Sequence, residues 1–286
     1  MTRTAKRLPP RAPAMIPGAV QFDMVSSFTG RNHRIFIAQP AGAPPPQGYP
    51  VFWAVDGNLT FPLAAAMSMA FASGGAPALV VAVGYPTDDP REIQALRRRD
   101  LTPPGPSCLD EANAGGADAF LSFLIHELRP AIAAGWTIDP DRQTLFGHSL
   151  GGLFAIDALL DRPESFSTYV ASSPSIWWRD CAVLEGEPGF AARMQARDCA
   201  PKVLITVGAR EQYVPARLPP GVDRACMARS LAEARMVDNA RELSVRLRTA
   251  DERPGYRVQF HAFDGEDHTT ALPAAVGRGM AFALNA

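Results

Sequence analysis

The residue with the clearest chemical potential is Ser149, at the centre of Gly147-His148-Ser149-Leu150-Gly151. A β-prone run precedes this pattern and an apolar, helix-prone run follows it. A serine on a sharp strand-to-helix turn needs glycine two positions away on each side, so that the backbones can pass. Such a turn exposes the hydroxyl at a helix N-terminus, where unpaired N–H groups can stabilise negative charge. The sequence therefore predicts a nucleophile elbow, and not an ordinary glycine-containing turn, with Ser149 as the nucleophile.

A nucleophilic serine needs a base, and in hydrolases built on this elbow the chain order is serine, acid, histidine. Of the five histidines only His261 and His268 follow the serine. His261 is inside the apolar run 257–263, which is typical of a strand, whereas His268 comes in the loop after it. His268 is therefore the predicted base. His148 adjoins the nucleophile, but in a turn of this kind its side chain points away.

The third member of such a triad orients the imidazole and stabilises its charged form. Its expected place is the loop after the strand predicted over 203–207, and that loop contains Glu211. Glu211 is the predicted acid, although a serine–histidine dyad without a placed acid stays open. Three further carboxylates near the predicted base are rivals: Asp264, Glu266 and Asp267.

An ester hydrolase also needs two donors for the oxyanion. The first is predicted to be the backbone N–H of Leu150, the residue after the nucleophile. The second should come from the loop after the apolar run 51–55, which reads Asp56-Gly57-Asn58. Glycine lets the backbone approach a substrate closely, so the N–H of Gly57 or of Asn58 is the predicted second donor.

Apolar runs and helix-prone segments alternate along the whole chain. The runs 49–55 and 78–83 are apolar throughout, as expected of strands buried on both faces. This alternation predicts an α/β-hydrolase fold, in which a mostly parallel central sheet carries helices on both faces. We expect one catalytic domain over residues 22–286, after an irregular arm over 1–21. Helices are expected over 61–71, 117–134, about 223–249 and 272–284, and 84–114 is expected to be a long polar segment.

Composition limits the partners. The net charge is −1 and the pI is near 6.5, so no nucleic-acid-binding surface is expected. No run approaches the roughly 18 apolar residues of a membrane span, and the basic N-terminus is not followed by the apolar region of a signal peptide. A cytoplasmic enzyme is therefore expected, or a periplasmic one if a longer precursor exists.

No metal or organic cofactor is expected. The four cysteines show no zinc-ligand spacing, so they are expected to be reduced thiols, with disulfides left open. They are Cys108, Cys181, Cys199 and Cys226.

From about residue 22 to the C-terminus the chain resembles the esterase D-type α/β-hydrolases, and specifically the siderophore-ester hydrolases that cleave ferric enterobactin, salmochelin and bacillibactin. The motifs that carry the resemblance are Val55-Asp56-Gly57-Asn58, Val83-Gly84-Tyr85-Pro86, Arg99-Asp100-Leu101-Thr102-Pro103, Gly147-His148-Ser149-Leu150-Gly151-Gly152, Ser173-Pro174-Ser175-Ile176-Trp177-Trp178, Thr206-Val207-Gly208-Ala209-Arg210-Glu211 and Gly265-Glu266-Asp267-His268.

The resemblance implies that the serine attacks an ester of a siderophore trilactone and that iron is released after the ligand is linearised. It also implies an arginine that faces the substrate, which maps to Arg99, with Arg98 and Arg97 next to it. A guanidinium suits an anionic catecholate complex. Trp177 and Trp178 could form an aromatic wall for catechol rings. The family's periplasmic members carry an export signal or an anchor, and this chain shows neither.

Two other functions stay open. A general carboxylesterase or thioesterase, similar to S-formylglutathione hydrolase, would need the triad but neither the arginines nor the tryptophans. A non-catalytic binding protein on a hydrolase scaffold would need none of them intact. Turnover of a nitrophenyl ester separates an enzyme from a binding protein.

Overall fold

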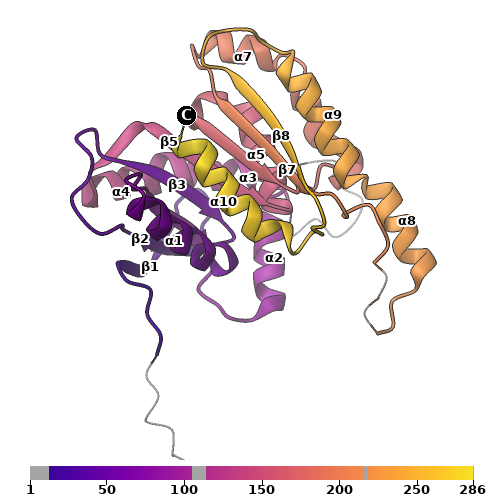
Figure 1. Ribbon diagram of the computed structural model, residues 1–286, viewed down its shortest axis with the longest axis horizontal. Helices are drawn as coiled ribbons and strands as arrows, with labels where there is room; N and C mark the ends of the chain where they lie inside the picture. The colour runs from indigo at the N-terminus through magenta and orange to yellow at the C-terminus, as the bar shows by residue number, and fades with distance from the viewer. Residues whose placement is uncertain (1–12, 105–113, 216–217, 219, 286) are drawn as a thin grey trace, which may run out of the picture.

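The computed structural model describes residues 13–104, 114–215, 218 and 220–285. Its centre is a sheet of eight strands in the order β1-β2-β4-β3-β5-β6-β7-β8 (Figure 1). From β4 to β8 all neighbouring strands are parallel, and the pairs β1–β2 and β2–β4 are antiparallel. The strands are β1 Ala19–Val25, β2 Asn32–Ala38, β3 Tyr49–Val55, β4 Leu79–Gly84, β5 Ile138–His148, β6 Thr168–Ser172, β7 Lys202–Gly208 and β8 Arg257–Phe263.

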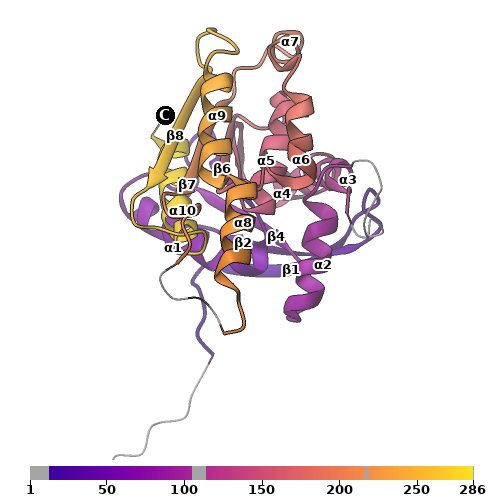
Figure 2. The same ribbon diagram turned by 90° about the vertical axis from the view of Figure 1, so that its right-hand side faces the viewer.

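Helices cover both faces of this sheet. Figure 2 shows α1 and α10 on one side and α5 and α9 on the other. The α-helices are α1 Gly57–Ser73, α2 Pro90–Asp100, α3 Ala117–Phe123, α4 Arg129–Gly135, α5 Leu150–Asp161, α6 Trp178–Cys181, α7 Phe190–Ala196, α8 Arg224–Ala234, α9 Met236–Arg248 and α10 Ala271–Leu284. Short helices of other types are Leu124–Leu128, Pro163–Ser165 and Ala182–Gly186. The α/β-hydrolase fold predicted from the sequence is confirmed.

The core has two parts because side chains alternate across a strand. In β3, Trp53 and Val55 belong to the cluster that packs under α3 and α5. Phe52 and Ala54, between and beside them, belong to the cluster under α1 and α10. This explains why the run 49–55 is apolar at every position. The strand ends that carry the candidate site are thus fixed from both sides.

Several expected boundaries were wrong. The polar segment 84–114 contains α2, which begins with Pro90 behind the capping side chain of Asp89. The helix expected over 117–134 is interrupted by a π-helical turn at Leu124–Leu128. The helix expected over about 223–249 is two helices, because Arg235 between them has a φ of 44°. The strand β1 begins at Ala19, inside the segment expected to be an irregular arm, and residues 1–12 of that arm lie outside the described residues.

Within the described ranges, no helix combines the length and apolar character needed to cross a membrane. Cys181, Cys199 and Cys226 are free thiols, and Cys108 lies outside the described residues.

Candidate active site

The predicted elbow is present at the junction of β5 and α5. Ser149 has φ 60° and ψ −117°, a strained conformation for a residue with a side chain. A Cβ atom on Gly147 would overlap the backbone of Gly151, which shows why the pattern needs glycine there. The backbone N–H of Ser149 donates to the carbonyl of Ser172 at 2.9 Å, so the neighbouring strand β6 holds the turn.

Glu211 lies against the imidazole of His268. Its Oε2 accepts from Nδ1 of His268 at 2.7 Å, and its Oε1 accepts from Ser173 Oγ and from the backbone N–H of Gly208, both at 2.6 Å. Only 4% of Glu211 is exposed, so these three donors satisfy a nearly buried carboxylate. A proton held on Nδ1 by a carboxylate leaves Nε2 as the acceptor that a general base requires.

The three rival carboxylates have other positions. Asp267 accepts from the backbone N–H groups of Thr269 and Thr270 at 2.9 and 3.0 Å, just before α10. The hydrogen bond from Thr270 is the main reason why the pKa of Asp267 is lowered. Among the described residues, the carboxylate that contacts the imidazole of His268 is that of Glu211. No contact to this ring is found for Asp264 or Glu266.

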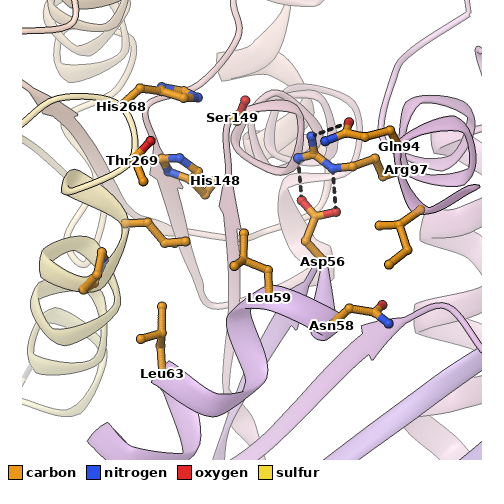
Figure 3. A pocket seen from close by; sticks show the side chains of 13 residues that line it. Asp56, Asn58, Leu59, Leu63, Gln94, Arg97, His148, Ser149, His268 and Thr269 are labelled. Atoms are coloured by element: carbon orange, nitrogen blue, oxygen red, sulfur yellow. Dashed lines mark hydrogen bonds and ion pairs between the residues drawn. The ribbon is translucent and has the colours of Figure 1, made fainter. Parts of the chain in front are cut away.

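Ser149 and His268 line the same pocket, and Figure 3 shows the hydroxyl and the imidazole next to one another at its edge. In the part of the chain that the structure describes, the hydroxyl of Ser149 contacts Ser175 Oγ at 3.4 Å, and no hydrogen bond joins it to the imidazole of His268. Such contacts commonly tighten only when substrate binds.

His148 packs against the ring of His268, with the ring centroids 4.7 Å apart. Its Nδ1 is 2.9 Å from Ser172 Oγ. Burial, followed by the neighbouring His268, lowers the pKa of His148 to about 3. This imidazole is therefore neutral near pH 7, and it supports the ring of His268 instead of competing with it as a base.

The predicted oxyanion donors lie at two helix N-termini. Leu150 is the first residue of α5, and Gly57 and Asn58 are the first two of α1. First-turn N–H groups have no partner within their own helix, so they are available to an anion. The Asn58 carboxamide is held by Tyr85, accepting from its N–H at 2.8 Å and donating to its carbonyl at 3.0 Å. These hydrogen bonds fix the start of α1 against the end of β4.

The pocket has a volume of about 550 Å³ and two kinds of wall. Side chains from α1, α2 and α10 form an apolar wall of Leu59, Leu63, Ile93, Leu272 and Pro273. The rest of the lining is polar, and its main feature is an ion pair between Arg97 and Asp56 (Figure 3). Arg97 donates through Nε and Nη2 to the two oxygens of Asp56, at 2.9 and 2.7 Å. Burial opposes the charged form of Arg97, but the ion pair outweighs it and raises the pKa of Arg97.

The arginine that lines the pocket is thus Arg97, whereas the sequence favoured its neighbours Arg99 and Arg98. Arg98 and Arg99 follow it on α2 but are exposed and do not line the pocket. Trp177 and Trp178 do not line it either; their ring centroids are 6.0 Å apart, and Trp177 is 40% exposed. Substrate contacts of these four residues stay predictions. Sequence reasoning also missed Ser173, the hydroxyl that donates to Glu211, although its motif was visible.

Fold and site together define the class: this is an α/β-hydrolase of the serine-esterase type. Two helix N-termini, an elbow serine and an imidazole held by a carboxylate meet where the parallel strands end, as in other sheets of this kind. The chain belongs to the esterase family described as "Putative esterase", whose model matches residues 26–261.

Relatives of known activity extend this result. The chain is 35% identical to the ferri-bacillibactin esterase BesA of Bacillus subtilis, over 94% of this chain and 91% of that protein. It is 36% identical to the siderophore triacetylfusarinine C esterase of Aspergillus fumigatus, over 81% of this chain and 80% of that protein.

Solved structures agree with these relatives. The siderophore hydrolase EstB from Aspergillus nidulans superposes with a TM-score of 0.83 at 30% identity, covering 96% of this chain and 98% of that one. The BES protein from Bacillus cereus gives a TM-score of 0.80 at 30% identity, covering 96% and 99% of the two chains. The resemblance to siderophore esterases seen in the sequence is confirmed.

Proposed function

We propose that this protein is a serine esterase that hydrolyses the ester bonds of a catecholate siderophore trilactone, so that the bound iron can be released. The observation that carries the proposal is the Glu211–His268 pair beside the elbow serine, in a chain whose relatives are siderophore esterases. The substrate is a small molecule, and any iron belongs to it.

The chemistry follows from the geometry of the pair. Ser149 Oγ attacks the ester carbonyl carbon while Nε2 of His268 takes the hydroxyl proton. The carboxylate of Glu211, 2.7 Å from Nδ1, stabilises the imidazolium that forms. The N–H of Leu150, with that of Asn58 or Gly57, holds the oxyanion. When the tetrahedral intermediate collapses, the imidazolium gives its proton to the leaving alkoxide, and water then hydrolyses the acyl-enzyme by the reverse proton path.

The walls of the pocket support an anionic, partly aromatic substrate. A ferric tris-catecholate is anionic, and Arg97 supplies a guanidinium to the lining of the pocket that contains the nucleophile. The ion pair with Arg97 neutralises the charge of the Asp56 carboxylate, which would otherwise repel both the substrate and the developing oxyanion. The apolar wall from α1 and α10 suits the hydrocarbon faces of catechol rings.

The test is hydrolysis of ferric and iron-free tris-catechol trilactone by the purified protein, followed by chromatography of the products. Ser149→Ala is the control, and nitrophenyl acetate is run beside it. Stepwise release of linear trimer, dimer and monomer by the wild type alone supports the proposal. Cleavage of nitrophenyl acetate without cleavage of the trilactone would leave a general esterase, and unchanged hydrolysis by Ser149→Ala would refute the nucleophile.

A further inference from the structure

We propose that Ser175 is a second catalytic hydroxyl, which donates a hydrogen bond to Ser149 Oγ as that oxygen leaves the acyl-enzyme. The inference rests on the proposed role of Ser149 as nucleophile and adds a residue to its deacylation step. In the described part of the chain, the hydrogen-bond partner of the Ser175 hydroxyl is the hydroxyl of Ser149, at 3.4 Å.

Ser175 is held in place by the nucleophile itself. Its backbone N–H donates to the carbonyl of Ser149 at 3.1 Å, and its own carbonyl accepts from the N–H of Trp178 at 3.1 Å. Only 2% of Ser175 is exposed. The hydroxyl is therefore preorganised beside the reacting oxygen and needs no reorganisation during the reaction.

The local backbone is shaped to admit this turn. The elbow requires glycine at 147 and 151, but the chain has a further glycine, Gly152, which the elbow does not require. A Cβ atom on Gly152 would lie 2.7 Å from the carbonyl oxygen of Ser172 and 2.9 Å from Cα of Pro174. Ser173, at the start of the same turn, has a φ of 42°, which is strained for serine. Both features bring the turn that carries Ser175 against α5 and the nucleophile.

The effect should differ between the two half-reactions. Before acylation, Ser149 Oγ is a neutral hydroxyl that can already accept a hydrogen bond from Ser175, so this donor gains little in the transition state. In the acyl-enzyme the same oxygen is an ester oxygen and a poor acceptor. During deacylation water attacks the acyl carbon, its proton goes to His268, and the bond between that carbon and Ser149 Oγ breaks. The oxygen then carries alkoxide character until His268 returns the proton, so a donor stabilises this transition state more than its ground state.

The experiment separates the two steps in Ser175→Ala. Phosphorylation by diisopropyl fluorophosphate, in which Ser149 Oγ displaces fluoride, reports attack by Ser149 alone, whereas steady-state turnover of nitrophenyl acetate includes deacylation. We expect the phosphorylation rate to stay within about threefold of wild type and turnover to fall about tenfold or more, as for a lost hydrogen bond to a charged group. Intact-protein mass spectrometry should show the acetylated enzyme accumulating in the variant.

Two further variants keep the result interpretable. Ser68→Ala removes another buried hydroxyl, which is on α1, donates to the carbonyl of Ala78 and does not line the pocket. This variant should turn over as wild type. Ser175→Cys keeps the volume of the side chain but replaces the hydroxyl with a weak donor. It should show the same selective loss of turnover, and it serves as the test if Ser175→Ala does not fold. Equal losses in phosphorylation and turnover, or no loss in either, would overturn the role of Ser175. If the wild type itself is not phosphorylated at Ser149, the proposed function fails instead.

Discussion

Replacing Glu211 by glutamine isolates the charge of the proposed triad acid without changing its shape. The Oε1 position can still accept from Gly208 N–H and from Ser173 Oγ, both at 2.6 Å in the wild type. The new amide NH₂ then stands where Oε2 was, 2.7 Å from Nδ1 of His268. An NH₂ group can only donate there, so it favours the tautomer whose proton is on Nε2 and which cannot accept a proton from the nucleophile.

The size of the effect follows from the lost ion pair. Opposite charges about 4 Å apart attract by ~4 kcal/mol at an effective dielectric constant of about 20. The His268 side chain is 45% exposed, so solvent screens part of this attraction. We take ~2 to 4 kcal/mol as the loss of transition-state stabilisation, which at ~1.4 kcal/mol per tenfold is a fall in kcat of about 30- to 1000-fold.

The assay is steady-state hydrolysis of nitrophenyl acetate at pH 7 to 8, with the thermal unfolding midpoint measured on the same samples. Asp264→Asn is the matched control, because it removes an exposed carboxylate from the loop before His268. The reasoning is refuted if Glu211→Gln folds normally and keeps kcat within about threefold of wild type. It is refuted equally if Asp264→Asn loses as much activity.

Three other predictions follow from single residues. Arg97→Lys keeps a charge beside Asp56 but loses the two-pronged guanidinium, so KM for the ferric trilactone should rise about tenfold in steady-state assays, whereas Arg91→Ala on the same helix should not change it. Burial, with help from neighbouring aspartates, raises the pKa of Asp157 to about 7. The buried charge of Asp157 therefore destabilises the folded state fully above pH 7, and this cost falls as the pH is lowered towards 4. Asp157→Asn should add about 1–3 kcal/mol to the free energy of unfolding at pH 8 and nothing at pH 4, measured with urea. Gly147→Ala should cost at least ~4 kcal/mol, measured the same way, whereas Gly277→Ala on α10, where a Cβ makes ordinary contacts, should be tolerated.

The parts of the site that could be predicted are those set by local sequence. The elbow at Ser149 needs glycines at fixed spacing, and the order of serine, acid and base follows from the order of the strands. Glu211 and His268 were found because each comes directly after a strand whose apolar run is easy to recognise. Contacts between turns were not predictable in this way. That Ser173 donates to Glu211, or that Ser175 reaches Ser149, depends on how the turn after β6 packs against the elbow.

The arginine at the pocket shows why the rest was missed. Residues 84–114 showed no helical period of apolar positions, so no helix was expected there and the three arginines at 97–99 could not be assigned to faces. In the structure they are on α2, where consecutive residues are turned by about 100° from one another. Ile93, Gln94 and Arg97 lie within about one turn and face the pocket together. Arg98 and Arg99 must then point to other sides of the helix. Contacts with distant residues fix the rotation of α2: Arg97 pairs with Asp56 and Asp100 pairs with Arg31. Such contacts leave no periodic trace in the sequence.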